Sequence, residues 1–375
     1  MTDLVVVSLE RWDRVWRRNQ HLVSGLLAAD PKLRVLFVEP PADPMHDLVT
    51  RHAPGWGHRP RSVEGRARLL TYQPVKWMPR RVDRRADRRL AQRVMSTARR
   101  VGFERPLLWI NDPGAADVSA LSGWQTLYDI TDDWLAADRA DSEHSRLAAS
   151  EALLLSTAAE VVACSPELVR RKTPVRVGRP MTLIPNAVDV AAYQSPTQRP
   201  IDLPTKPVAL YVGTLHSDRL DIRLTADTAS ALRPAGTLVL VGPDLLTAED
   251  SHRLRDAGAL ILGTRSRDEV IAYLQHADVL VVPHLVNAFT DSLDPIKLYE
   301  YQAVDKPIIS TPVAGFRDAA SDRITLADAE RFAAAIGVAV AEWQPDRGGS
   351  SSAPDWSIRV EQAQSLLSRL AGQQG

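Results

Sequence analysis

The chain has 375 residues, of which 45% are hydrophobic and 25% are charged, and its formal net charge is zero. This length exceeds the size at which one hydrophobic core usually stops growing, so we expect two domains. The single cysteine, Cys164, excludes an internal disulfide and a cysteine zinc cluster. No apolar run is long enough to span a membrane, and the first residues lack the features of a signal peptide. These observations predict a cytoplasmic protein.

Short apolar runs alternate with amphipathic helical stretches along most of the chain. Strands that are buried on both faces and alternate with helices are typical of parallel sheets. The expected fold class is therefore α/β, with two Rossmann-like parallel-sheet domains facing a cleft. The strands expected from these runs are 4–7, 35–38, 69–72, 107–110, 126–130, 161–164, 182–184, 208–212, 237–241, 260–262, 279–282 and 308–310.

Four closely spaced prolines predict a linker over residues 196–207. The linker would separate an N-terminal domain, residues 1–195, from a C-terminal domain, residues 208–345. An amphipathic helix over 355–372 is expected to pack back on the N-terminal domain. Ligands of such sheets bind outside the carboxyl ends of the strands, so the loops at those ends should contain the site.

The positive charge is concentrated in one stretch of the first half. Residues 51–105 hold 16 basic and 4 acidic side chains. A basic helix over 80–100 is either a peripheral contact with an anionic inner membrane or lipid-phosphate acceptor, or a core helix with a solvated basic face. Nucleic-acid binding is not expected, because the overall charge is neutral and no aromatic and basic surface motif is present.

The segment that follows the strand at 279–282 carries the clearest chemistry. We expect a helix over 292–303 capped by Ser292, whose free amides would form an anion site at a carboxyl end of the sheet. Lys297 would add a positive charge there, and Glu300 lies on the same helix face. A lysine for phosphate and a carboxylate for vicinal hydroxyls suit a nucleoside diphosphate. The alternative is a surface salt bridge between the two.

Ten short motifs occur along the chain in a fixed order. They are Val5-Val6-Val7-Ser8, Arg18-Asn19-Gln20-His21-Leu22, Val35-Leu36-Phe37-Val38-Glu39-Pro40, Leu127-Tyr128-Asp129-Ile130-Thr131-Asp132-Asp133-Trp134, Cys164-Ser165-Pro166-Glu167-Leu168, Ile184-Pro185-Asn186-Ala187-Val188-Asp189, Tyr211-Val212-Gly213-Thr214-Leu215, Leu240-Val241-Gly242-Pro243, Leu262-Gly263-Thr264-Arg265 and Pro295-Ile296-Lys297-Leu298-Tyr299-Glu300-Tyr301. In this order they resemble family 4 glycosyltransferases with the GT-B fold, especially the bacterial cell-envelope branch that includes teichuronic acid glycosyltransferases. The resemblance covers about residues 4–318.

The resemblance implies an enzyme that moves a sugar from a nucleotide-diphosphate sugar to a hydroxyl acceptor, with retention, no cofactor and no obligatory metal. It implies that Glu300 holds the ribose, that Lys297 counters the diphosphate charge, and that Arg219 is a second phosphate contact. The donor-binding residues implied are Gly213, Thr214, Gly263, Thr264, Arg265, Ser292, Asp294, Pro295, Ile296, Lys297 and Glu300.

Two positions depart from the family pattern. Ser292 stands where many members carry a glutamate, and Thr214 stands where an arginine is common. Asp291 or Asp294 is the candidate substitute for the missing glutamate. The identity of the donor sugar therefore stays open.

A group of carboxylates follows the strand at 126–130. Asp132 and Asp133 are candidates for acceptor binding or general-base catalysis, or alternatively for capping the next helix. Trp12 and Arg18 follow the first strand and are candidate acceptor contacts, with loop packing and a solvated surface position as the alternatives. The predicted catalytic set is Lys297, Arg219, Asp132 and Asp133.

Two other functions fit the same architecture. The first is a nucleotide-sugar epimerase, which would change the donor without any acceptor. The second is a degenerate, non-catalytic subunit that binds a sugar nucleotide, an interpretation that Ser292 favours and that Lys297 and Glu300 oppose.

Overall fold

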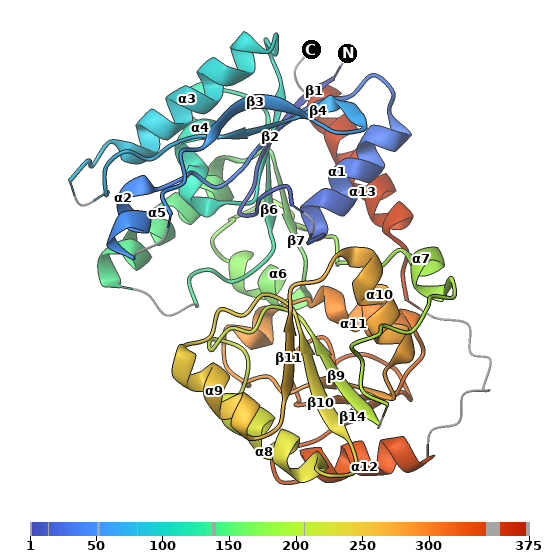
Figure 1. The fold of residues 1–375 in the computed structure, drawn as a ribbon. Helices are drawn as coiled ribbons and strands as arrows, with labels where there is room; N and C mark the ends of the chain where they lie inside the picture. Colours follow the sequence, from blue (N-terminus) through green and yellow to red (C-terminus); the bar gives the residue numbers. More distant parts are fainter. Residues whose placement is uncertain are drawn as a thin grey trace. The chain divides into compact units, whose positions relative to one another are not determined.

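The computed structural model describes residues 2–13, 15–50, 53–80, 82–136, 140–205, 207–342 and 353–372. The chain divides into two compact units (Figure 1). Unit 1 contains Met1–Asp13, Arg17–Pro185 and Ser357–Gly375, and unit 2 contains Arg14–Trp16 and Asn186–Trp356. Each unit is built on one largely parallel sheet with helices around it, which confirms the expected α/β class with two Rossmann-like sheets.

Unit 1 contains an eight-stranded sheet that is parallel except at one edge, where β3 runs antiparallel to β4. In spatial order the strands are β3 (His58–Val63), β4 (Arg66–Gln73), β2 (Arg34–Val38), β1 (Asp3–Val7), β5 (Leu107–Ile110), β6 (Thr126–Ile130), β7 (Glu160–Ala163) and β8 (Thr182–Leu183). The helices of this unit are α1 (Arg18–Ala29), α2 (Pro44–Val49), α3 (Ala86–Arg100), η1 (Pro113–Ala115), α4 (Ala116–Ser122), α5 (Asp141–Thr157), α6 (Pro166–Lys172) and α13 (Trp356–Gly372).

Unit 2 contains a six-stranded parallel sheet. In spatial order the strands are β11 (Leu260–Gly263), β10 (Thr237–Val241), β9 (Val208–Val212), β12 (Val279–Val282), β13 (Ile308–Ser310) and β14 (Ile324–Leu326). The helices are α7 (Val190–Gln194), α8 (Ile222–Leu232), α9 (Ala248–Asp256), α10 (Arg267–His276), η2 (Thr290–Ser292), α11 (Ile296–Ala303) and α12 (Phe332–Glu342). No helix in the described residues is long and apolar enough to cross a membrane.

Both sheets reverse their strand order next to the first strand of the unit. The reversal lies between β1 and β5 in unit 1 and between β9 and β12 in unit 2. Parallel sheets bind ligands at the carboxyl ends of the strands beside such a reversal. In unit 2 this rule selects the loops that begin at Gly213 and Pro283.

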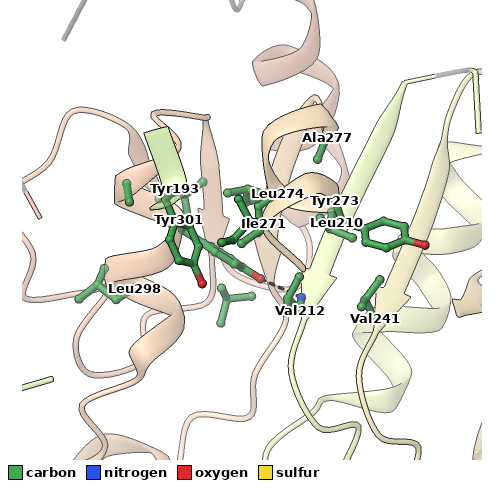
Figure 2. Packing of buried hydrophobic residues seen from close by; sticks show 14 of the residues in the cluster. Tyr193, Leu210, Val212, Val241, Ile271, Tyr273, Leu274, Ala277, Leu298 and Tyr301 are labelled. Atoms are coloured by element: carbon green, nitrogen blue, oxygen red, sulfur yellow. Dashed lines mark hydrogen bonds between the residues drawn. The ribbon is translucent and has the colours of Figure 1, made fainter. Parts of the chain in front are cut away.

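The core of unit 2 fixes the helix that follows β12. Figure 2 shows Tyr301 of α11 among Tyr193, Ile271 and Leu298, and Tyr301 is fully buried. The backbone amide of Val212 donates a hydrogen bond to the Tyr301 hydroxyl at 2.9 Å. Because this bond joins the carboxyl end of β9 to α11, it positions the helix against the loop that starts at Gly213.

The proline-rich segment belongs to unit 2 in the structure, although the sequence placed a linker there. The units divide at Pro185, before that segment. Leu203 is part of the unit 2 core, and Asp202 accepts hydrogen bonds from Tyr273 and Arg265. Prolines stiffen a chain whether or not it packs, so composition alone could not distinguish a free linker from a packed strap.

Two strands were not predicted. β3 consists mainly of polar residues and forms an edge hairpin with β4, so it lacks the apolar run of a central strand. β14 has only three residues, and two of them are exposed. The twelve expected strands are all present, several with bounds that differ by a residue or more.

Candidate functional site

α11 begins later than the sequence predicted. Its N-cap is Pro295, whose backbone is extended and whose side chain can offer no capping hydrogen bond. Ser292 lies in the separate turn η2 and donates its hydroxyl proton to the Phe289 carbonyl oxygen at 2.7 Å. The prediction that Ser292 caps the helix is therefore wrong. The first amides of α11, at Ile296 and Lys297, have no cap from a side chain, as an anion site requires.

The loop before α11 is held by Asp294. The carboxylate accepts hydrogen bonds from the Asn186 amide and, at 2.6 Å, from the Tyr299 hydroxyl. Asp291 instead forms an ion pair with Arg317 at 2.6 Å. Both candidate substitutes for the missing glutamate thus make contacts within the protein, and Asp294 fixes the start of the helix.

Lys297 lies in a polar cluster at the carboxyl ends of β9 and β12, which we call the Lys297 cluster: Tyr211, Arg219, His284 and Lys297. Its ammonium donates to His284 Nε2 at 3.3 Å and lies 4.0 Å from the centroid of the Tyr211 ring. The Tyr211 hydroxyl lies 3.1 Å from the same His284 nitrogen. While Lys297 is protonated its ammonium can only donate, so Nε2 then accepts and cannot itself carry a proton.

The electrostatics of this cluster disfavour positive charge. Burial, with a smaller contribution from the Arg219 charge, lowers the pKa of Lys297 to about 7, and Glu300 opposes the shift. Burial, with Lys297 and Arg219, also lowers the pKa of His284 well below its usual value. In the described residues the structure shows no ion pair for Lys297. The cluster therefore gains stability when an anion binds beside it.

Gly213 allows a close approach to the Lys297 ammonium. Its φ is +148°, and a Cβ at this position would lie 2.8 Å from Lys297 Nζ. The neighbouring Gly242 has a φ of +146°, and a Cβ there would collide with the Gly213 carbonyl oxygen. Only glycine can occupy both positions without moving the backbone. An anion can thus reach backbone and ammonium together.

Arg219 is held beside the cluster by its own loop. Its amide bonds to the His216 carbonyl, and its carbonyl accepts from the Leu285 amide at 2.8 Å. Its guanidinium lies 3.1 Å from Asp218 and 5.4 Å from the centroid of the Phe289 ring. The structure therefore brings Arg219 and Lys297 to the same end of the sheet.

Glu300 does not form a salt bridge with Lys297. Its Oε1 accepts a hydrogen bond from the Tyr193 hydroxyl at 2.6 Å. Burial raises the pKa of Glu300, although Tyr193 and Lys297 oppose the rise. Arg267 lies nearby on α10, where it pairs with Asp189 at 2.7 Å. The surface salt bridge between Lys297 and Glu300, which was the alternative interpretation, is absent.

In the loop after β11 the backbone, and not the side chains, is open to a ligand. Gly263 has a φ of +73°, with open space where a Cβ would be, and Thr264 is exposed. Arg265 donates to Leu262 O, to the Tyr273 hydroxyl and to Asp202, so it anchors the proline-rich segment. Thr214 lies beyond Gly213, and its carbonyl faces the Tyr211 hydroxyl at 3.4 Å.

Arg18 in unit 1 makes a buried contact with Asp129. Its exposed fraction is 4%, and its Nε and Nη2 donate to the two Asp129 oxygens, each at 3.2 Å. Trp109 and Asn111 also donate to this carboxylate at 3.2 Å. The carboxylate is saturated by the chain, so this pair stabilises the sheet end rather than presenting charge to a ligand.

Asp133 has a similar compensated environment. It accepts from Lys172 at 2.8 Å and from Arg171 at 3.0 Å. Burial would raise the pKa of Asp133, but these two hydrogen bonds lower it below its ordinary value. Neither Asp132 nor Asp133 caps a helix, because α5 begins only at Asp141, so the capping interpretation is wrong.

Trp12 packs against strand β2 and the residue that follows it. Its ring meets Phe37 edge-on at 5.1 Å between centroids, and its amide donates to Glu39 at 3.1 Å. Asp132, by contrast, is only partly buried and lies near Glu10, whose pKa burial raises to about 7. In the described residues no group of three or more histidine, cysteine or carboxylate side chains is arranged to hold a metal ion.

Sequence reasoning missed three members of the site. His284 directly follows a strand at the order reversal, so topology could have selected it. Tyr193 and Tyr211 had no such signal. The hydrogen bond from Tyr193 to Glu300 spans 107 positions of sequence, and only the fold brings the two together.

The fold and the Lys297 cluster define a GT-B-type α/β protein, and comparisons with known proteins agree. Residues 206–342 match the family model described as "Glycosyl transferases group 1", and this span includes Gly213, Arg219, His284, Lys297 and Glu300. The resemblance to this group of glycosyltransferases is thereby confirmed.

A more particular relative comes from Bacillus subtilis (strain 168): TuaH, named as a teichuronic acid biosynthesis glycosyltransferase. It is 25% identical over 223 residues, which is 56% of this chain and 56% of that relative. The chain thus matches just over half the length of this curated protein.

Solved structures show the same fold. Sucrose-phosphate synthase from Thermosynechococcus elongatus has a TM-score of 0.68 and 20% identity, covering 100% of both chains. HepE of Anabaena in complex with UDP-glucose has a TM-score of 0.64 and 13% identity, covering 100% of this chain and 99% of that one. At these identities the likeness extends to the fold alone.

Proposed function

We propose that this protein is a glycosyltransferase that moves a sugar from a nucleotide-diphosphate sugar to a hydroxyl acceptor. The observation that carries the proposal is the Lys297 cluster, where a lysine with a pKa of about 7 lies against Gly213 and the uncapped start of α11. The family match over 206–342 and the cell-envelope relative support it. Two neighbours of the same fold were solved with UDP-glucose and UDP-2-fluoro glucose.

In this proposal the diphosphate binds at the first amides of α11. Lys297 and Arg219 counter its charge, and Glu300 accepts hydrogen bonds from the ribose hydroxyls. The bond between the anomeric carbon and the phosphate oxygen breaks, and negative charge grows on the departing diphosphate. An ammonium in a desolvated site stabilises that charge more than one in water would.

We also propose that transfer retains the anomeric configuration and needs no obligatory metal. The acceptor oxygen bonds to the anomeric carbon on the face that the phosphate leaves, and its proton passes to the leaving phosphate oxygen. No protein base is then required. Lys297 and Arg219 replace a divalent cation as the countercharge to the phosphates.

For the acceptor we propose unit 1. A cavity of about 40 Å³ lies at the carboxyl ends of β1 and β2, lined in part by Ser8, Glu39 and Asp112. Burial raises the pKa of Asp112, although the Gly114 amide donates to it at 2.7 Å. A cavity of this volume holds only a few water molecules, so its carboxylates and hydroxyl would bind single hydroxyl groups of a sugar acceptor and not enclose the ring. The replacement Asp112→Asn should raise the KM for acceptor and leave donor affinity unchanged.

Binding and turnover test the proposal separately. A nucleoside diphosphate that binds the native state raises its melting temperature, so uridine, guanosine and thymidine diphosphates are compared with their monophosphates. Absence of any shift would contradict the donor site. The bound donor is then incubated alone and with acceptors. A changed sugar without acceptor would favour an epimerase, and binding without turnover would favour a non-catalytic subunit.

A further inference from the structure

Unit 1 carries a concentrated patch of exposed apolar side chains. Seven of the seventeen exposed large apolar residues found in the described chain fall between residues 45 and 82. Scattered exposed apolar residues are ordinary, but contiguous groups mark interaction surfaces. The apolar patch consists of Met45, Leu48, Val49, Trp56, Trp77, Met78 and Val82.

Several contacts bring the segments of the patch together. The amide of Ala42 bonds to the Pro74 carbonyl, and the amide of Lys76 bonds to the Ala42 carbonyl, each at 2.8 Å. The Trp56 and Trp77 rings lie 6.2 Å apart between centroids. The Gly55 amide donates to Asp47 of α2 at 2.8 Å. These contacts place α2, the turn before β3 and the segment after β4 next to one another.

In the described residues these side chains are exposed and can contact a partner. Val49 is 79% exposed, Val82 is 67% exposed and Trp56 is 62% exposed. Removing an indole or a branched aliphatic side chain from water is favourable, in proportion to the apolar area that is buried. A surface that leaves such groups in water gains stability when an apolar phase covers it.

The border of the patch is strongly basic. Four exposed arginines follow Val82 at the start of α3: Arg84, Arg85, Arg88 and Arg89. α3 itself buries Ala91, Val94 and Ala98, so it is a core helix with a basic outer face. α3 therefore supplies positive charge beside the apolar patch.

We propose that this surface docks on an anionic lipid membrane. Tryptophan suits the boundary between acyl chains and head groups, where its ring is apolar and its N–H stays wet. Each basic side chain near an anionic bilayer adds roughly a fivefold gain in partitioning. A second copy of the chain would place the patch against itself and bring arginines against arginines, which costs electrostatic energy.

Vesicle co-sedimentation of the full chain tests the proposal. Vesicles of mixed phosphatidylglycerol and phosphatidylcholine should bind the protein, with less binding at high salt and little binding to phosphatidylcholine alone. The double replacement Trp56→Ser and Trp77→Ser should reduce partitioning by about tenfold per ring. The triple replacement Arg84→Gln, Arg85→Gln and Arg88→Gln should reduce it by about fivefold per charge.

Matched controls separate the surface from general hydrophobicity. Val49→Ser lies inside the patch, while Ile201→Ser and Val338→Ser remove one more exposed and one less exposed aliphatic group from unit 2. Only the first should weaken vesicle binding. Equal effects of all three, or no vesicle binding by the wild type, would overturn the proposal. Self-association that Trp77→Ser abolishes would assign the patch to a second copy instead.

The proposal stands apart from the proposed transferase function. Nucleotide-induced thermal shifts should be unchanged in every patch variant, because the patch and the Lys297 cluster belong to different units. A protein that binds nucleotide but ignores vesicles would contradict only the membrane surface. One that binds vesicles but no nucleotide would contradict only the transferase.

Discussion

The two units share a strand order but differ in how they treat charge at the carboxyl ends of their strands. In unit 1 the buried charges are matched within the chain: Asp129 receives four hydrogen bonds, and Lys172 lies 2.8 Å from both Asp133 and Glu151. In unit 2 the Lys297 ammonium faces a neutral imidazole and an aromatic ring.

This difference distinguishes the structural charges of unit 1 from the candidate binding site of unit 2. A matched buried pair fixes geometry, and removing one partner leaves an uncompensated charge. A buried ammonium without an ion-pair partner can instead interact with a bound anion. The fold bears the free-energy cost of burying it. Replacing charged residues should therefore cost stability in unit 1 and activity in unit 2.

The largest expected effect is on the stability of unit 1. Asp129→Ala leaves Arg18 buried without its carboxylate and should lower the free energy of unfolding by about 3–5 kcal/mol, measured by urea denaturation. The control Glu167→Ala removes the partner of Arg170 and Arg171 at the surface and should cost much less stability, because solvent screens these pairs. Similar losses in both variants would contradict the scaffold role.

The second effect concerns turnover. Lys297→Met removes the ammonium and should lower kcat/KM by about 100- to 1000-fold, the range found when one oxyanion-stabilising donor is lost. Its melting temperature should stay the same or rise, because a desolvated ammonium is removed. The matched change in unit 1, Lys172→Met, should lower the melting temperature. A lower melting temperature of Lys297→Met would contradict the proposed difference between the two units.

The third effect is smaller and separates ribose from phosphate. Glu300→Gln keeps the shape of the side chain but loses the carboxylate charge, so nucleoside diphosphate affinity should fall by about tenfold in calorimetry. Pyrophosphate binding should be unchanged in this variant and lost in Lys297→Met. Equal loss of pyrophosphate affinity in both would show that Glu300 acts on the phosphates.

The smallest effect is a change in protonation. With a pKa of about 7, Lys297 is mostly neutral at pH 8 in the free protein, and a bound diphosphate would raise that pKa. Donor binding at pH 8 should then take up nearly one proton, and affinity should fall as pH rises above 7. Calorimetry in buffers of different ionisation enthalpy measures the uptake, which Lys297→Met should abolish.

Much of the fold could be predicted, because its central strands are continuous apolar runs. Val208–Val212 and Val279–Val282 are fully apolar, and the structure buries both. The polar edge strand β3 has no such pattern, since its pairing with β4 and not its own burial makes it a strand. The packing of the proline-rich segment likewise depends on tertiary partners such as Tyr273.

Part of the site could be predicted as well. Lys297 and Glu300 lie on one helix face by spacing alone. The start of that helix could not be placed, because Asp294 and the extended backbone of Pro295 delay it beyond Ser292. The buried ion pair of Arg18 could not be foreseen, because its partner Asp129 is 111 positions away in the sequence.

The last helix has a consequence for how the protein is made. α13 belongs to unit 1, where Val360 fills the space beside Gly25 of α1, and Leu366 and Leu370 are buried. Domains generally fold in order during synthesis, but this unit lacks part of its core until α13 leaves the ribosome. A fragment ending at Pro185 should therefore expose the α1 face and aggregate. A permuted version of unit 1, in which α13 is joined ahead of β1, should fold without unit 2.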